Sequence, residues 1–213
     1  MIRLKAQDRT RLQRFNSFPS NYEMSAEDAL RWNVRYRQER YSTFEEPRSF
    51  LTEHAAYLPD HGLALDVAMG LGGNARFLLK HGLRVVGTDI SGVALQHAKS
   101  NLPQLMAVLT DLPNFYLAPS KFDVILNFYF LERELWPKYK RALKPGGILI
   151  FETLTQEMQK IHPEIDPHYL LKPRELCRAF DDLEILVYRE GWYESDHNHP
   201  RAVASLIARV PAW

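Results

Sequence analysis

Three aspartates stand at or just beyond the ends of three short apolar runs that are rich in valine, isoleucine and leucine. Asp66 comes near the end of the first run, Asp89 ends the second, and Asp111 follows the third. Runs of this kind predict buried parallel strands, whose carboxyl ends meet at one edge of a sheet. We therefore expect the three carboxylates to line a single crevice, where each can accept hydrogen bonds or balance a cation.

The three positions suit three parts of a nucleoside ligand that carries an amino group. A carboxylate at Asp66 repels a pyrophosphate and suits an ammonium group, or a water that bridges to one. Asp89 can accept hydrogen bonds from both hydroxyls of a ribose. Asp111 can accept one from an adenine amino group while the Leu112 backbone meets the ring edge. Two structural interpretations stay open: Asp89 as the N-cap of the helix predicted over 91–100, and Asp111 as a turn residue.

A glycine-rich turn follows Asp66 and opens the helix predicted over 73–81. Gly70 and Gly72 bring backbone N–H groups close to a ligand, and Asn74 lies in the first turn of that helix. The spacing also fits the fingerprint of dinucleotide-binding proteins, so the glycines alone do not choose a cofactor. Taken with the three acids, they predict a site for the ammonium, ribose and adenine of S-adenosylmethionine, and no phosphate is expected.

The elements that must position these groups alternate between apolar runs and helical stretches. This alternation predicts an α/β fold, a doubly wound, Rossmann-like sheet with helices on both faces. We predict seven strands, over residues 63–68, 83–89, 105–109, 122–128, 147–152, 183–189 and 202–210. We predict helices over residues 26–39, 48–58, 73–81, 91–100, 131–143 and 173–180.

The last two predicted strands lack a helix between them. Residues 191–201 hold only a polar turn, and adjacent strands without a crossover helix pair antiparallel. The sheet is therefore expected to be mostly parallel, with its last strand antiparallel. The Lys-Pro-Gly-Gly segment over 144–147 predicts the end of a helix and the turn into the fifth strand.

The first 24 residues differ in composition from the rest. Five basic side chains within residues 1–14 oppose one aspartate, so we expect a basic, poorly ordered tail over 1–24. The alternative is an RNA-binding arm, but this segment lacks the aromatic or glycine pattern that accompanies such arms. Ser25 suits an N-cap, and we expect one domain over 25–213 with a helical cap over 25–60.

Composition excludes several classes of protein. The chain has 213 residues, of which 46% are hydrophobic and 25% charged, as in a globular domain rather than a disordered chain. Its one cysteine, Cys177, excludes an internal disulfide, and we expect it to be a buried, small apolar residue. A net charge of +1 gives no strong field for nucleic acid or an anionic membrane. Without a secretory signal or a run long enough for a membrane helix, we expect a cytoplasmic protein with neither partner.

Four segments resemble motifs of the class I S-adenosylmethionine-dependent methyltransferases. They are the glycine-rich turn over 65–75, the end of the second strand over 87–91, the fourth strand over 122–127, and residues 142–149. Within that superfamily, the aromatic and basic segment over 32–36 resembles the small tellurite-resistance-type enzymes. The resemblance covers roughly residues 25–210 and implies methyl transfer to a small-molecule nucleophile. It does not select an oxygen, sulfur, nitrogen, carbon or metalloid acceptor.

The resemblance also implies residues around the cofactor and the acceptor. For the cofactor it adds Ala68, Ile90 and Asn127 to the positions above. For the acceptor it implies Tyr36, Phe128, Tyr129, Phe130 and Glu152. Ala68 replaces the first glycine of the family's triplet, which we expect to be tolerated if its φ stays negative. An alternative for Glu152 is an ion pair with Arg133.

The histidines offer further hypotheses. His162 and His168 lie in the segment 154–172, where the family places part of a substrate lid, and they are candidate acceptor contacts. His197 and His199 lack a third strong ligand nearby in the sequence, so we expect a solvated loop and no metal site. No side chain is an unmistakable general base, and the catalytic residue is left unassigned.

Two other functions are alternatives to methyl transfer. A non-catalytic S-adenosylmethionine-binding protein would retain the cofactor site without a pocket that faces the methyl group. A nicotinamide-dependent oxidoreductase fits the glycine spacing, but Asp66, Asp111 and the reversed last strand argue against it. The sequence does not indicate an oligomeric state.

Overall fold

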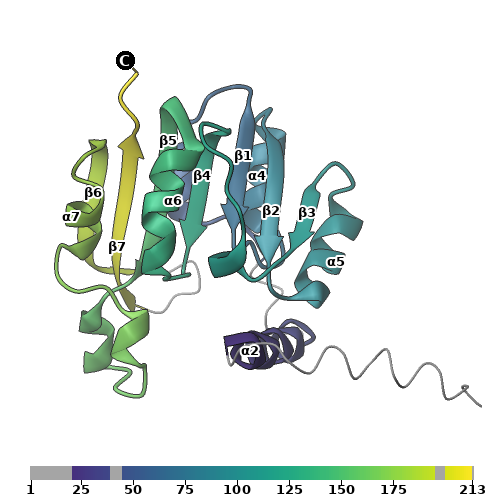
Figure 1. Ribbon diagram of the computed structural model, residues 1–213. Helices are drawn as coiled ribbons and strands as arrows, with labels where there is room; N and C mark the ends of the chain where they lie inside the picture. The colour runs from purple at the N-terminus through teal and green to yellow at the C-terminus, as the bar shows by residue number, and fades with distance from the viewer. Residues whose placement is uncertain (1–20, 39–44, 195–199, 213) are drawn as a thin grey trace, which may run out of the picture.

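Strand β1 (Leu63–Val67) lies inside a seven-stranded sheet, and each of its residues is buried. The computed structural model describes residues 21–38, 45–194 and 200–212. The strands run in the order β3-β2-β1-β4-β5-β7-β6 (Figure 1). The remaining strands are β2 (Arg84–Asp89), β3 (Met106–Leu109), β4 (Phe122–Phe128), β5 (Leu143–Leu154), β6 (Glu184–Glu194) and β7 (Pro200–Arg209).

The pairing confirms the predicted sheet. Strands β1 to β5 pair in parallel, whereas β7 runs antiparallel to both β5 and β6. The strand order reverses beside β1, because β2 continues the sheet on one side and β4 on the other. In open α/β sheets, ligands bind at the carboxyl ends of the strands at this kind of switch point.

Helices cover both faces of the sheet. They are α3 (Ser49–Glu53), α4 (Gly73–Lys80), α5 (Gly92–Asn101), α6 (Trp136–Ala142) and α7 (Glu175–Ala179), whereas α2 (Asn21–Tyr36) lies beyond the carboxyl ends of the strands (Figure 1). On one face, Trp136 of α6 and Leu176 of α7 join a buried cluster with the strands. On the other face, side chains of α3, α4 and α5 form a second cluster around Phe50 and Leu78. Because the central strands are buried on both faces, they read as nearly continuous apolar runs.

Several helix ends differ from the predictions. Helix α2 begins at Asn21, so Ser25 lies inside the helix and is not its N-cap. The helix predicted over 131–143 is split into the 3₁₀ turn η5 (Arg133–Leu135) and α6, because Pro137 suits the first turn of a new helix. The helix predicted over 48–58 is likewise split into α3 and the 3₁₀ turn η3 (Ala55–Tyr57). Within the described ranges, no helix has the length and apolar character needed to cross a membrane.

Strand β5 begins earlier than predicted, at Leu143 instead of Gly147. The pairing with β4 jumps from Phe122–Leu143 to Val124–Ile148, so the Lys-Pro-Gly-Gly segment is an irregular bulge within the strand. Gly146 has a φ of 76°, a left-handed conformation that glycine adopts readily. The predicted turn is therefore present, but β5 pairs with β4 both before and after it.

The segment 156–171 follows β5 and contains two 3₁₀ turns, η6 (Gln156–Lys160) and η7 (Pro167–Tyr169). It has a small core of its own, in which Met158 and Leu170 pack against Ala202 of β7. Its two ends lie side by side, because the Gln156 N–H donates to the Leu171 carbonyl. Figure 1 shows this segment and α2 at the same end of the sheet, the end where β1, β2 and β4 finish.

Candidate active site

A cavity of about 850 Å³ lies at this carboxyl edge of the sheet, lined by residues of α2, the strand ends and the segment 156–171. Most of the residues expected at the site line it. They are Tyr36, Asp66, Ala68, Gly70, Asn74, Asp89, Ile90, Asp111, Leu112, Phe128, Tyr129 and Phe130. Gly72, Asn127 and Glu152 are not among the residues that line it. The cavity can therefore bring the three aspartates and the aromatic residues after β4 to one ligand.

Asp66 is the most unusual group in the cavity. Its carboxylate is buried, and its Oδ2 has no hydrogen-bond partner among the described residues. Burial and the nearby charge of Asp89 raise the pKa of Asp66 to about 8, against smaller opposing effects of the Ala75 N–H and the Arg48 guanidinium. An unpartnered buried oxygen is costly, so a cationic donor in the cavity would stabilise the site.

Asp89 is buried and held by backbone groups. Its Oδ2 accepts a hydrogen bond of 2.8 Å from the Gly70 N–H, and its Oδ1 accepts one of 2.8 Å from the Ser91 N–H. Burial raises the pKa of Asp89, and these N–H groups oppose the shift. Each carboxylate oxygen has capacity for a further donor. The N-cap of α5 is Ser91, whose Oγ accepts from the Ala94 N–H, so Asp89 does not perform that task.

Asp111 has the turn position considered for it from the sequence, and it also lines the cavity. Leu112 beside it is buried. Asp111 precedes the 3₁₀ turn η4 (Leu112–Asn114), where the Asn114 amide donates to its Oδ2 at 3.2 Å. The turn thus holds the carboxylate at the rim of the cavity.

The turn after β1 contains left-handed backbone at Ala68 as well as at Gly70 and Gly72. Ala68 has a φ of 49°, so the condition set for tolerating alanine in place of glycine, a negative φ, is not met. The Met69 N–H still donates to the Thr88 carbonyl at 2.9 Å, which ties the chain to β2 just after Ala68 and requires a sharp turn there. For a residue with a Cβ, this conformation costs roughly 1–2 kcal/mol. Strain of this kind concentrates at functional sites.

Helix α2 covers the glycine-rich turn. Asn33 fastens the helix to the start of α5, since its Oδ1 accepts from the Ser91 hydroxyl at 2.8 Å and from the Val93 N–H at 3.1 Å. The Tyr36 hydroxyl lies so close to Gly70 that a side chain at that glycine would collide with it. The resemblance of residues 32–36 pointed to Tyr36, but it gave no reason to single out Asn33.

The chain after α2 returns to the same turn at residues 45–48. The Asn74 side-chain oxygen accepts from the Arg48 N–H at 2.9 Å, and a methyl group on Gly73 would overlap the Glu46 carbonyl. Arg48 thereby lines the cavity, near enough to Asp66 for its charge to lower the pKa of that carboxyl. Sequence reasoning missed Arg48, because no local motif marks it.

Beyond β4, Tyr129 faces the cavity in a left-handed conformation with a φ of 53°. Its N–H donates to the Glu152 carbonyl at 2.8 Å, and its hydroxyl donates to Oε1 of the same residue at 3.0 Å. Glu152 is buried beneath it, where its Oε2 also accepts from Ser205 at 2.6 Å and from Arg189 at 3.3 Å. Glu152 therefore supports a residue of the cavity wall instead of lining the wall itself.

Asn127 has a similar supporting position. Its side-chain N–H₂ donates to the Phe130 carbonyl at 2.6 Å, and its Oδ1 accepts from the Tyr139 hydroxyl at 3.0 Å. Both contacts fix the turn after β4, on which Phe128 and Tyr129 lie. Because its amide is bonded to other residues and Asn127 does not line the cavity, its expected contact with the cofactor stays a prediction.

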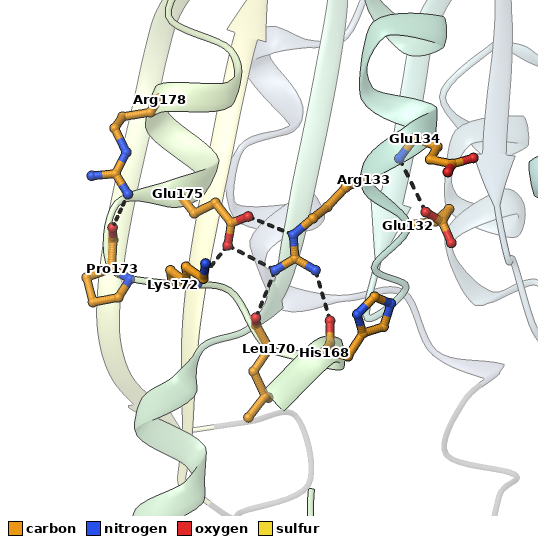
Figure 2. A network of polar contacts seen from close by, with 9 residues as sticks. All are labelled: Glu132, Arg133, Glu134, His168, Leu170, Lys172, Pro173, Glu175 and Arg178. Atoms are coloured by element: carbon orange, nitrogen blue, oxygen red, sulfur yellow. Dashed lines mark hydrogen bonds and ion pairs between the residues drawn. The ribbon is translucent and has the colours of Figure 1, made fainter. Parts of the chain in front are cut away.

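Arg133 pairs with Glu175 and not with Glu152 (Figure 2). Its Nε and Nη2 lie 2.7 and 3.0 Å from the two carboxylate oxygens. The same guanidinium donates to the carbonyls of His168 and Leu170 at 2.9 and 3.1 Å. This clamp joins η5 to the segment 156–171, which supplies His162 and His168 to the cavity lining.

The remaining predictions concern Cys177 and the histidines His197 and His199. Cys177 is half-buried, and its neighbour Leu176 is the fully buried residue of α7, so the expectation of a buried thiol is wrong. His197 and His199 lie outside the described residues.

Comparisons with known proteins agree with this geometry. Residues 64–147 match the model of a methyltransferase domain. A malonyl-[acyl-carrier protein] O-methyltransferase of Herminiimonas arsenicoxydans is 30% identical over 119 residues, which are 51% of this chain and 45% of that protein. The chain spans about half the length of the curated relatives it matches.

Solved structures share the fold at low sequence identity. A chain of the complex between the Haloferax volcanii Trm112 methyltransferase activator and a methyltransferase has a TM-score of 0.68 and 15% identity, covering 84% of this chain and 97% of its own. Geranyl diphosphate C-methyltransferase of Streptomyces coelicolor, solved with S-adenosyl-L-homocysteine, has a TM-score of 0.60 and 15% identity, covering 75% of this chain and 76% of its own. The sheet thus has the Rossmann-like fold that these solved methyltransferase structures share, and residues 64–147 match a methyltransferase domain.

Proposed function

We propose that the protein transfers a methyl group from S-adenosylmethionine to a small-molecule nucleophile. The observation that carries this proposal is the buried, unpartnered oxygen of Asp66 in a cavity that also contains Asp89 and the glycine-rich turn. When bound, the cofactor would supply a methyl group on a positively charged sulfur.

The cavity offers a partner for each polar part of this cofactor. Asp66 would bind the ammonium group, and Arg48, the cation beside it, would bind the carboxylate of the same amino-acid tail. The remaining acceptor capacity of Asp89 suits the ribose hydroxyls, while Asp111 and the Leu112 backbone suit the adenine edge. None of these positions requires a phosphate, which agrees with the choice of cofactor made from the sequence.

The chain's contribution to methyl transfer would be positioning and the exclusion of water. Phe128, Tyr129 and Phe130 stand at the exit of β4, and α2 and the segment 156–171 flank the cavity. In-line transfer depends on holding the nucleophile in the correct direction at short range. Burial and the Glu152 carboxylate raise the pKa of Tyr129, so its hydroxyl stays protonated at neutral pH and does not serve as a general base.

Cofactor titration tests the proposal directly. We expect S-adenosylmethionine and S-adenosylhomocysteine to bind the full chain in calorimetry, and NAD not to bind. Asp66→Asn should weaken both by more than tenfold, because a neutral amide cannot balance the ammonium charge. The matched control is Asp60→Asn, which changes an exposed aspartate outside the cavity lining. Binding of NAD alone would favour an oxidoreductase, and an unaltered affinity of the Asp66 variant would refute the placement of the ammonium group.

Turnover separates an enzyme from a protein that only binds the cofactor. Transfer of a labelled methyl group to members of a panel of small nucleophiles would establish catalysis. The panel includes thiols, phenols, carboxylic acids and metalloid oxyanions, the last because of the resemblance to small tellurite-resistance-type enzymes.

A further inference from the structure

Arg201 lies at the start of β7, two strands beyond β4 in the sheet, and lines the cavity. Its guanidinium carbon is 5.0 Å from the centre of the Tyr129 ring, and its charge opposes the rise in the pKa of that tyrosine. Asp89 lies at the end of β2, on the other side of β1. Arg201 therefore stands away from the ribose end of the proposed cofactor site, on the side that an acceptor would occupy.

The contacts of Arg201 differ from those of Arg133 and Arg189, two other arginines near this edge. Arg133 is matched by both oxygens of Glu175, and Arg189 lies between Glu53 and Glu152. In the described part of the chain, the side-chain contact of Arg201 is with the face of the Tyr129 ring. A cation over an aromatic face keeps its planar array of donors available for a carboxylate.

Tyr129 is itself arranged to hold this cation in place. Its strained backbone and its hydroxyl are both fixed by Glu152, and that carboxylate is in turn held by Ser205 and Arg189. The result is a chain of contacts, from the Arg201 guanidinium over the Tyr129 ring and from the Tyr129 hydroxyl to Glu152. Such an arrangement limits the positions that the guanidinium can take, and it explains why a strained residue persists at this point of the wall.

The surroundings of Arg201 are partly apolar. Leu154, Met158 and Ile165 of the adjoining strand end and segment line the same cavity, together with Tyr169. A ligand that satisfies both the cation and these side chains has a carboxylate at one end and an apolar body.

We propose that Arg201 binds the carboxylate of the methyl acceptor, and that the acceptor is a small carboxylic acid with an apolar body. This inference rests on the proposed function, because the cofactor defines which side of the cavity receives the acceptor. Arg48 and Arg201 both lie against the Tyr129 ring, at 4.8 and 5.0 Å, yet they have separate tasks: Arg48 holds the cofactor and Arg201 holds the acceptor.

The experiment compares benzoate with benzamide, two probes of nearly the same shape that differ in charge. Calorimetry is performed on the full chain saturated with S-adenosylhomocysteine. We expect benzoate to bind at least tenfold more tightly than benzamide, and Arg201→Gln to remove this difference while leaving S-adenosylhomocysteine affinity within twofold. Arg201→Lys keeps the charge without the planar fork and should retain part of the preference. The matched control is Arg209→Gln, because Arg209 lies on the same strand, pairs with Glu184 and does not line the cavity.

The two proposals fail in different ways. If S-adenosylhomocysteine does not bind to the unaltered chain, the proposed function fails and this inference fails with it. If it binds, but benzoate binds no more tightly than benzamide or Arg201→Gln leaves the preference intact, the acceptor assignment alone is overturned. Arg48→Gln should show the opposite pattern, with a loss of S-adenosylhomocysteine affinity, and unchanged binding in that variant would contradict the division of tasks.

Discussion

Tyr129 is held at both ends by a single residue, Glu152. The backbone N–H of Tyr129 donates to the Glu152 carbonyl at 2.8 Å, and its hydroxyl donates to the Glu152 carboxylate at 3.0 Å. These two bonds join the turn after β4 to the neighbouring strand β5, and they hold Tyr129 at a φ of 53°. The cavity wall is thus formed by a strained residue whose conformation is fixed from beneath by a buried carboxylate.

Tyr129→Phe should lower the free energy of unfolding by about 1–2 kcal/mol, because it removes a hydrogen bond to a buried carboxylate. Urea denaturation measures this change. The control is Tyr116→Phe, in which the altered ring is 73% exposed and the expected change is within about 0.5 kcal/mol. Equal effects in the two variants would mean that the bond to Glu152 adds nothing to stability.

Asp66 should make the stability of the cofactor-free protein depend on pH. Burial and Asp89 raise its pKa to about 8 in the folded protein, from an ordinary value of 3.8. Between these values the folded protein holds a proton that the unfolded chain has released, so the free energy of unfolding falls as pH rises. Asp66→Asn cannot ionise, and it should flatten most of this slope in denaturation curves measured from pH 5 to 8. The slope left in the variant is expected to have the same sign, since burial also raises the pKa of Asp89.

The same carboxyl links cofactor binding to proton release. An ammonium group favours the ionised form of Asp66, so S-adenosylhomocysteine should bind more tightly as pH rises from 5 to 7.5 and should release a proton on binding. Calorimetry in two buffers of different ionisation enthalpy measures that proton. A binding enthalpy independent of the buffer at pH 6.5 would show that Asp66 is already ionised in the free protein.

The sheet could be predicted from the sequence because its signals are local. Each buried parallel strand is a short apolar run, each helix lies between two such runs, and the missing helix before β7 indicates an antiparallel pair. The three aspartates could be placed for the same reason, since the carboxyl end of a strand fixes where its last side chain lies. What remained open in the fold were helix ends and the start of β5, where a proline and a bulge decide the details. The last hairpin was also predicted too short, because β6 runs to Glu194 and pairs with β7 within residues that were expected to form only a polar turn.

The rest of the site depends on contacts between distant parts of the chain. Asn33 and Ser91 are hydrogen-bonded although they are 58 residues apart in the sequence, and no pattern near Asn33 indicates that it contacts the start of α5. Glu152 lies beneath the cavity wall, and this placement depends on the left-handed backbone conformation of Tyr129. Residues with a Cβ seldom adopt that conformation. The φ of Ala68 could not be predicted from the sequence either, because the hydrogen bond from the Met69 N–H to β2 determines it.

Asn33→Ala should loosen the cover that α2 provides. The variant loses the acceptor for the Ser91 hydroxyl and the Val93 N–H, so Tyr36 would no longer be held over Gly70. We expect about a tenfold loss of S-adenosylhomocysteine affinity, equivalent to ~1.4 kcal/mol, with faster amide exchange in α2. Arg31→Ala is the control on the same helix, because it removes an exposed ion pair with Asp28. If both variants bind the ligand equally well, α2 plays no part in holding it.

Arg133→Met should release the segment 156–171 from η5. The substitution keeps an unbranched side chain of similar length but removes the paired bonds to Glu175 and the bonds to the carbonyls of His168 and Leu170 (Figure 2). Because the clamp lies on the acceptor side of the cavity, the affinity for S-adenosylhomocysteine should stay within twofold. Hydrogen exchange should instead become at least tenfold faster at the amides of residues 169–171, which lie in and just after η7.

A second pair of variants shows whether geometry or charge holds this segment. Arg133→Lys keeps the positive charge, but an ammonium group lacks the planar array of donors that contacts one carboxylate and two carbonyls together. We therefore expect amide exchange in this variant to be as fast as in Arg133→Met. Lys140→Met is the matched loss of charge, because Lys140 pairs with the exposed Asp182 and lies outside the cavity lining. Normal exchange in Arg133→Lys would mean that charge alone is sufficient. Faster exchange in Lys140→Met would mean that the segment responds to any loss of positive charge on this face, and the role assigned to Arg133 would be wrong.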